Sequence, residues 1–178
     1  MMLRATRKDL DRWAMSLFSE DPELLKLARR VSEATGAPVV GGIAVFLHGY
    51  RRTTEDIDLF VEDARAVADA LEHMGAEWDE RAKEFVLEGV PIHLVTGAET
   101  GGPPRETAEI QNVRVVGLAD LIRFKLKSGL GHPERAQDIA DILALIRVVP
   151  LDKRFAARLP ANQRAPFKKL VDAVRKTR

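Results

Sequence analysis

Two carboxylates separated by a single residue, Asp56 and Asp58, are the strongest chemical signal in the chain, and they open the alternating segment 56–62. Alternation of this kind is typical of a strand, in which residues i and i+2 point to the same face about 7 Å apart. Carboxylates placed in this way can share one Mg²⁺ or bridge two metal ions. Because two acids also repel each other, the pair predicts a bound cation. The alternative is a chance Asp-x-Asp on a surface strand.

A glycine pair precedes these acids. The predicted strand 38–40 runs into Gly41-Gly42 and then into a short apolar helix over 43–48. Glycine allows a ligand to approach the backbone closely, and the amide groups at the start of a helix favour anions. An ordinary strand-to-helix turn would use the same residues. One short helix and a return to the adjacent strand fit between Gly42 and Asp56, so the two features together predict a metal–phosphate site.

In this combination the chain resembles the polymerase-β nucleotidyltransferase superfamily, whose signature is a Gly-Gly turn followed by Asp-x-Asp. It is most similar to the small bacterial branch that includes the AbiEii-type abortive-infection toxins. Three segments match that branch in order, and the resemblance spans roughly 39–147, most of the folded core. They are Arg52-x-Thr54-x-Asp56-Ile57-Asp58, Leu121-Ile122-Arg123-Phe124-Lys125-Leu126 and Arg135-x-x-Asp138-x-x-Asp141-Ile142.

The resemblance implies a nucleoside triphosphate bound with Mg²⁺, or alternatively with Mn²⁺, and transfer of a nucleotidyl group to an acceptor hydroxyl. It implies that Asp56 and Asp58 hold the metal and that the glycine pair contacts the triphosphate. Two further residues of the site would come from later helices.

In the implied site, Lys125 neutralises the nucleotide phosphate and Asp138 orients the nucleotide or completes the site. Arg52 binds phosphate or the acceptor, or else pairs with Glu55 or Asp56 to hold its loop. Lys125 also lies on an apolar helix face, from which its ammonium group would reach solvent without any catalytic role.

The chain departs from the superfamily at His93, because many active members carry a third acid on the corresponding strand. A neutral imidazole can bind a metal, although it suits Zn²⁺ or Mn²⁺ better than Mg²⁺. It can also act as a base toward an acceptor hydroxyl, or fill a strand position in an inactive site. If the hairpin loop is Gly89-Val90, Glu84 and Glu88 flank His93 on one face; a shift of the loop by one residue removes that arrangement.

Helices and strands alternate along the chain with turn residues between them, which predicts an α+β (α/β-like) fold with a mixed sheet of about four or five strands flanked by helices. Residues 97–107 are predicted to form a Gly/Pro loop. The predicted strands are 38–40, 56–62, the hairpin 83–88 and 91–96, and 113–116. The predicted helices are 8–18, 22–35, 43–48, 64–74, 118–127, 134–148 and two short ones after Pro150, divided by Pro160.

Charge is spread unevenly over the 178 residues. The segment 150–178 carries nine Lys or Arg against two Asp, although the net charge of the whole chain is only +1. We therefore predict a nucleotidyltransferase-like domain with N-terminal helices over 1–149 and a basic helical C-terminal extension over 150–178. A basic extension is compatible with RNA, while a solvated helical face is the alternative.

Composition limits the remaining classes of protein. The chain has no cysteine, which excludes disulfides and zinc–thiolate sites, and its longest uncharged run, 34–50, is too short to span a bilayer. The prediction is a cytoplasmic nucleotidyltransferase with no membrane partner. The resemblance to the AbiEii-like branch implies a toxin role, with an antitoxin protein as partner. The alternatives are an inactive protein of the same fold that binds nucleotide, RNA or a partner protein, and an α/β domain whose acid pair is only a surface feature.

Overall fold

The computed structural model describes residues 22–176, so the predicted helix 8–18 lies outside the described residues. One seven-stranded sheet in the order β3-β4-β5-β2-β1-β7-β6 forms its centre. Its strands are β1 Val39–Val40, β2 Ile57–Val61, β3 Glu77–Asp79, β4 Glu84–Leu87, β5 Val90–Thr96, β6 Thr107–Ile110 and β7 Val113–Val116.

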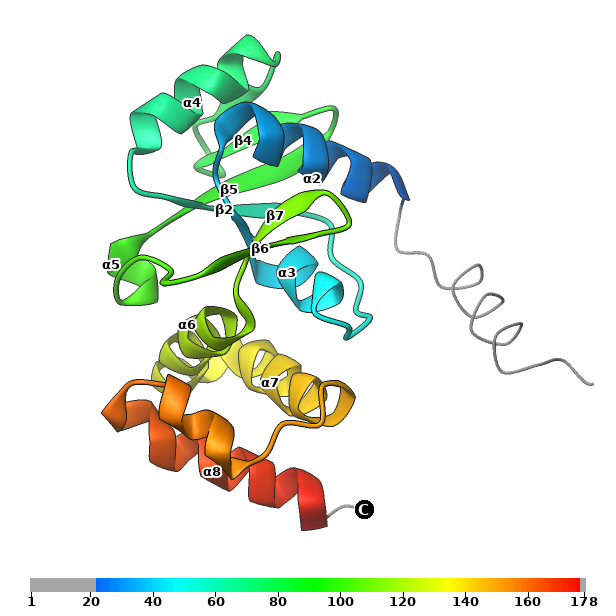
Figure 1. The fold of residues 1–178 in the computed structure, drawn as a ribbon. Helices are drawn as coiled ribbons and strands as arrows, with labels where there is room; N and C mark the ends of the chain where they lie inside the picture. The colour runs from blue at the N-terminus through cyan, green and yellow to red at the C-terminus, as the bar shows by residue number, and fades with distance from the viewer. Residues whose placement is uncertain (1–21, 177–178) are drawn as a thin grey trace, which may run out of the picture.

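Helices cover both faces of this sheet (Figure 1). The helices α2 and α4 pack against each other on one face, while α3 and the C-terminal helices lie on the other. Their bounds are α2 Pro22–Thr35, α3 Gly41–Leu47, α4 Ala64–His73, α5 Gly97–Thr100, α6 Leu118–Gly131, α7 Ala136–Val148 and α8 Ala161–Lys176, with the 3₁₀ helices η1 Pro133–Arg135 and η2 Lys153–Arg158. The predicted fold class, α+β with a mixed sheet flanked by helices, is confirmed.

The predicted number of four or five strands is wrong, because β3 and β6 extend the sheet at its two edges. All three residues of β3 are exposed, and β6 alternates only between exposed and half-buried positions. Edge strands of this kind bury little apolar surface, so they leave almost no periodic signal in the sequence. The predicted loop 97–107 likewise contains the short helix α5 and the first residue of β6.

The hairpin β4–β5 turns one residue earlier than predicted. Leu87 pairs with Val90, so the two-residue turn is Glu88-Gly89. Both turn residues have positive φ, 54° and 80°, as a tight type I′ hairpin turn requires. This register moves Glu88 away from His93, and Glu88 pairs with Arg30 instead. Glu84 still lies beside His93, so the expectation that a shifted turn removes both glutamates is wrong for Glu84.

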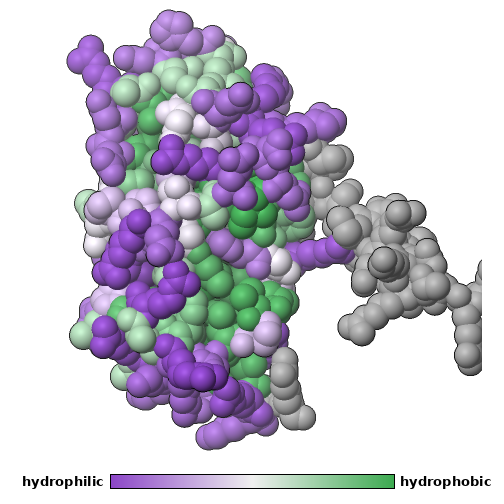
Figure 2. All heavy atoms as spheres, viewed as in Figure 1, coloured by the Kyte–Doolittle hydropathy of each residue, from purple (hydrophilic) through white to green (hydrophobic). Residues whose placement is uncertain are grey.

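The C-terminal part consists of η2 and α8 on either side of Pro160, which confirms two helical elements divided at that proline. Buried Phe167, Val171 and Val174 lie on α8, which packs on α6 and α7. Hydrophobic residues show between the polar ones on the lower half of the face in Figure 2. None of the helices within 22–176 is both long enough and apolar enough to cross a bilayer.

Helix α6 continues four residues beyond its predicted end at 127. In this added turn Gly129 lies against α7, where a Cβ atom would come within 2.8 Å of Ile139. The helices α6 and α7 pack closely against each other and lie below the sheet in the view of Figure 1.

Candidate functional site

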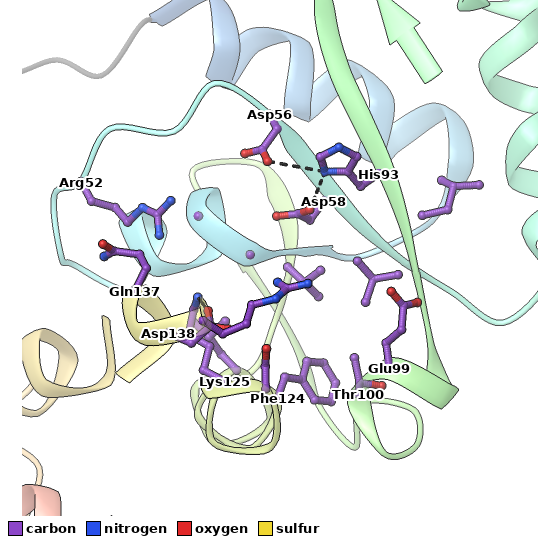
Figure 3. A pocket seen from close by; sticks show the side chains of 18 of the residues that line it. Arg52, Asp56, Asp58, His93, Glu99, Thr100, Phe124, Lys125, Gln137 and Asp138 are labelled. Carbon is purple, nitrogen blue, oxygen red and sulfur yellow. Dashed lines mark hydrogen bonds and ion pairs between the residues drawn. The ribbon is translucent and has the colours of Figure 1, made fainter. Parts of the chain in front are cut away.

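The acid pair and His93 converge on one point at the centre of the sheet (Figure 3). Asp58 lies on β2 directly opposite His93 on the parallel strand β5, and Asp56 lies just before β2. The Nδ1 atom of His93 is 3.2 Å from Asp58 Oδ1 and 3.5 Å from Asp56 Oδ2. The predicted convergence of the two carboxylates is therefore accompanied by an imidazole from the neighbouring strand.

These three side chains fit a divalent cation. One ligand atom from each lies within 4.8 Å of the other two. Neighbouring ligands around an ion with bonds of about 2.1 Å are separated by roughly 3 Å, which is close to the measured His93–carboxylate distances. Asp56 is also held in place by Thr54, whose hydroxyl group donates a 2.7 Å hydrogen bond to Oδ1.

The surrounding acids raise the pKa of His93 to about 9. The hydrogen bond to Asp58 is the largest cause, and burial opposes it. A 2.6 Å hydrogen bond to Glu84 and the charges of Asp58 and Asp56 raise the pKa further. At neutral pH and without a metal, His93 is therefore an imidazolium ion that neutralises part of the acid cluster.

This raised pKa predicts a pH-dependent stability. The folded protein holds the His93 proton more tightly than the unfolded chain, whose His pKa is about 6.5, so the stabilisation is complete below pH 6.5 and is lost as the pH rises through 9. Because the side chain is 38% exposed, solvent screening reduces the expected loss to the order of 1 kcal/mol. Urea unfolding at pH 6 and pH 9.5 with a chelator should show this loss in the wild type. An equal loss in His93→Gln would contradict it.

Positions 41 and 42 require glycine, because the acid pair and the residue that holds it leave no room for a Cβ atom there. Gly41 has a φ of 62°, and a Cβ atom there would lie 1.7 Å from Asp58 Oδ2. A Cβ atom on Gly42 would lie 2.4 Å from the hydroxyl oxygen of Thr54, which holds Asp56. The helix α3 begins at these glycines rather than at the predicted Ile43, so its first turn packs directly on the acid pair.

Replacing Gly41 with Ala should therefore cost more than backbone strain alone. Gly36 offers a matched control, because its φ is 66° and nothing lies within 4 Å of an added Cβ atom. Gly36→Ala should lose about 1–2 kcal/mol of unfolding free energy through left-handed backbone strain. Gly41→Ala should lose at least roughly 1 kcal/mol more, since Asp58 must move. Urea denaturation measures both, and equal losses would show that the close approach to Asp58 is unimportant.

A buried charge network forms the other side of the site. The Lys125 ammonium group on α6 is 2.7 Å from both Asp138 and Asp141 on α7. Asp141 is fully buried and also accepts hydrogen bonds of 2.9 Å from Arg52 and Gln137. Arg52 therefore pairs with Asp141 and not with Glu55 or Asp56, and Lys125 already has two carboxylate partners.

All eight predicted site residues line one cavity of about 570 Å³ (Figure 3). They are Gly41, Gly42, Arg52, Asp56, Asp58, His93, Lys125 and Asp138. Sequence reasoning missed other lining residues, among them Lys83, Glu99, Thr100 and Phe124. Arg135 also lines the cavity and makes no ion pair with any residue in the described part of the chain.

The most consequential omission is Arg123, which is buried behind the cavity wall. It donates to Asp120 at 2.9 Å and to the carbonyl oxygen of Pro103 at 2.7 Å. Longer hydrogen bonds of 3.3–3.4 Å reach the carbonyl groups of residues 100–102. The sequence offered only its place in the matched segment 121–126 and an Asp three residues before it on one helix, and neither identifies these contacts.

Comparison with known proteins supports the fold and leaves the family open. No protein-family model matches the sequence, and no curated protein matches it either. The structure is similar to that of a candidate nucleotidyltransferase from H. pylori, with a TM-score of 0.55 and 14% identity over 87% of this chain and 93% of that one. A candidate nucleotidyltransferase from Thermotoga maritima gives a TM-score of 0.46 and 16% identity over 70% of this chain and 94% of that one. The H. pylori likeness shows that this chain has a nucleotidyltransferase-like fold.

Proposed function

We propose that the protein is a nucleotidyltransferase that binds a nucleoside triphosphate and a divalent cation in the cavity around Asp56 and Asp58. The observation that carries this proposal is the convergence of Asp56, Asp58 and His93 on a cavity of nucleotide size in a nucleotidyltransferase-like fold. Asp56 and Asp58 would hold Mg²⁺, with Mn²⁺ as the alternative. When bound, the ion would neutralise charge on the phosphate oxygens.

The cationic side of the cavity supports triphosphate binding. Arg135 has no carboxylate partner within 22–176, and Arg52 reaches the cavity while its guanidinium group contacts Asp141. Lys125 supplies charge at the same end, but its ammonium group is already bound by Asp138 and Asp141. Direct phosphate contacts are therefore better assigned to Arg135 and Arg52, with Lys125 and Asp138 shaping the nucleotide site between them.

The reaction that follows from this arrangement is transfer of a nucleotidyl group. The acceptor hydroxyl oxygen attacks the α-phosphorus, and the bond from that phosphorus to the bridging oxygen of the β-phosphate breaks. Pyrophosphate leaves with the bonding electrons, and the hydroxyl proton passes to water. Asp56 and Asp58 contribute by fixing the position of positive charge beside the reacting phosphate, where charge is greatest in the transition state.

We also propose an acceptor and a biological role. RNA is the acceptor that the basic segment 150–178 favours, since its Lys and Arg side chains suit a polyanion. The motif resemblance to the AbiEii-like branch supports a toxin role, which would place an antitoxin protein among the partners and the protein in the cytoplasm.

A transfer assay tests the proposal. The protein is incubated with each of the four α-³²P-labelled ribonucleoside triphosphates, Mg²⁺ or Mn²⁺, and a mixture of RNA and protein acceptors. Transfer of label to an acceptor is the expected result. Absence of both transfer and metal-dependent nucleotide binding would overturn the proposal.

A second candidate function is an inactive protein of the same fold that binds nucleotide, RNA or a protein partner. The specific observation in its favour is that protonated His93 already neutralises the acid pair without a metal. In the assay above, nucleotide binding without transfer under any metal condition would favour this second candidate.

A further inference from the structure

Three acidic or basic side chains lie in a row across neighbouring strands on the cavity face of the sheet. Glu84 on β4, His93 on β5 and Asp58 on β2 form this row, in which each ring nitrogen of His93 faces a different strand. Nε2 is 2.6 Å from Glu84 Oε2, whereas Nδ1 faces Asp58 and Asp56 at 3.2 and 3.5 Å. The imidazole is therefore held between a carboxylate on one side and the acid pair on the other.

The next acid along the row, Asp79 on β3, does not contact His93 in the same way as Glu84. Asp79 pairs with Glu84 across the β3–β4 ladder, but its carboxylate accepts hydrogen bonds from the backbone amides of Arg81 and Ala82. Glu84 itself is only 19% exposed, so its carboxylate is kept against the ring. The geometry gives His93 one dedicated hydrogen-bond acceptor on the side away from the acid pair.

A hydrogen bond of this kind determines which ring nitrogen of a neutral imidazole carries the proton. The ring then carries one N–H and one lone pair, and a carboxylate at Nε2 holds the N–H at that nitrogen. The lone pair remains on Nδ1, which faces the acid pair. Pairs of a carboxylate and a metal-binding histidine orient the ring and increase its basicity toward the metal.

We propose that Glu84 is a positioning residue that turns Nδ1 of His93 toward the cation site, and that the resulting set of two carboxylates and one imidazole selects Mn²⁺ over Mg²⁺. This inference rests on the proposed function, because it concerns the same cation site. Mg²⁺ prefers a shell of oxygen atoms, whereas an imidazole ligand favours transition-metal ions. The hairpin register that places Glu84 beside His93 thus determines which ion the site takes.

Metal binding to the intact protein tests the proposal without relying on turnover. The unbound Mn²⁺ signal in electron paramagnetic resonance gives the Kd for Mn²⁺, and competition gives the Kd for Mg²⁺. We expect the wild type to bind Mn²⁺ about tenfold or more tightly than Mg²⁺. We also expect modulation of the bound Mn²⁺ spin echo by an imidazole nitrogen.

Four variants separate the roles of the residues. Glu84→Met, which removes the acceptor at nearly constant length, should weaken Mn²⁺ binding by about 10–100-fold and leave Mg²⁺ binding almost unchanged. Glu84→Gln keeps an acceptor oxygen and should recover much of the loss. His93→Asp should abolish the nitrogen modulation and reduce the preference for Mn²⁺ over Mg²⁺. Glu88→Gln, on the same hairpin but paired with Arg30, is the control and should bind both ions like the wild type.

The outcomes distinguish this inference from the proposed function. Equal Mn²⁺ affinity in Glu84→Met and the wild type, or a bound Mn²⁺ without nitrogen modulation, overturns the role of Glu84 and His93 even if nucleotidyl transfer proceeds. Failure of the wild type to bind either ion, with or without a nucleoside triphosphate, overturns both the inference and the proposed function. Thermal unfolding of each variant in chelator shows whether a loss of binding reflects a loss of folding.

Discussion

Asp58→Asn is expected to reduce nucleotidyl transfer by about 10²–10³-fold or more, which is the largest effect on activity that the structure predicts. The substitution keeps the shape of the side chain but removes the negative charge between Gly41 and His93. A cation held by Asp56 and His93 alone would be weakly bound and poorly placed. Initial rates with labelled nucleoside triphosphate, at several metal concentrations, measure the loss.

Glu62→Gln is the matched control for this experiment, since it removes one carboxylate charge directly after β2 but outside the acid cluster. Its transfer rate should equal that of the wild type. If Asp58→Asn also retained the wild-type rate under saturating metal, the acid pair would not be the catalytic metal site. A reduced rate that high metal concentration restores would instead show that Asp58 acts mainly by binding the ion.

Asp141→Ala should produce the largest loss of stability. This fully buried carboxylate is 2.7 Å from Lys125 and 2.9 Å from Arg52, and its removal leaves both cations without that partner. Removing one member of a buried ion pair typically costs about 3–5 kcal/mol, because the desolvated charge that remains is not compensated. Urea denaturation of wild type and variant measures the change in unfolding free energy.

Asp172→Ala provides the comparison at the surface. Its ion pair with Lys153 is 2.7 Å long, but both side chains are 47% exposed, so the expected loss is about 0–1 kcal/mol. Similar losses in Asp141→Ala and Asp172→Ala would mean that the network of α6, α7 and Arg52 does not stabilise the fold. A large loss confined to Asp141→Ala would show that this network holds the helices against the cavity.

The parts of the site that could be predicted were those that carry a recognisable pattern in the sequence. Strand alternation was enough to place Asp56 and Asp58 together, and a family resemblance brought Lys125 and Asp138 to the same cavity. The position of Glu88 was not predictable in this way. It lies beside His93 only if the hairpin turns at 89–90, and both possible turn dipeptides, 88–89 and 89–90, contain Gly89.

Other features depended on contacts that carry no local sequence signal. The edge strands β3 and β6 lack a buried face, so their residue pattern does not differ from that of a loop. Arg123 bonds mainly to backbone carbonyl groups, which every residue possesses, so its partners could not be identified before the chain was folded. Gly41 lines the cavity, and its close neighbour is the carboxylate of Asp58, a contact that the separation of the two residues along the chain did not reveal.

The hydrogen bonds of Arg123 have a consequence for the energetics of substrate binding. They tie the carbonyl groups of residues 100–103 to α6, and Thr100 in this segment lines the cavity. The conformational entropy of that wall is therefore lost during folding rather than when a ligand arrives. Because this entropy is not lost again when a ligand binds, a preorganised wall increases the affinity for the ligand. On another side of the cavity, Arg52 precedes β2 in a segment without regular secondary structure, so this part of the wall lacks the backbone hydrogen bonds that hold residues 100–103.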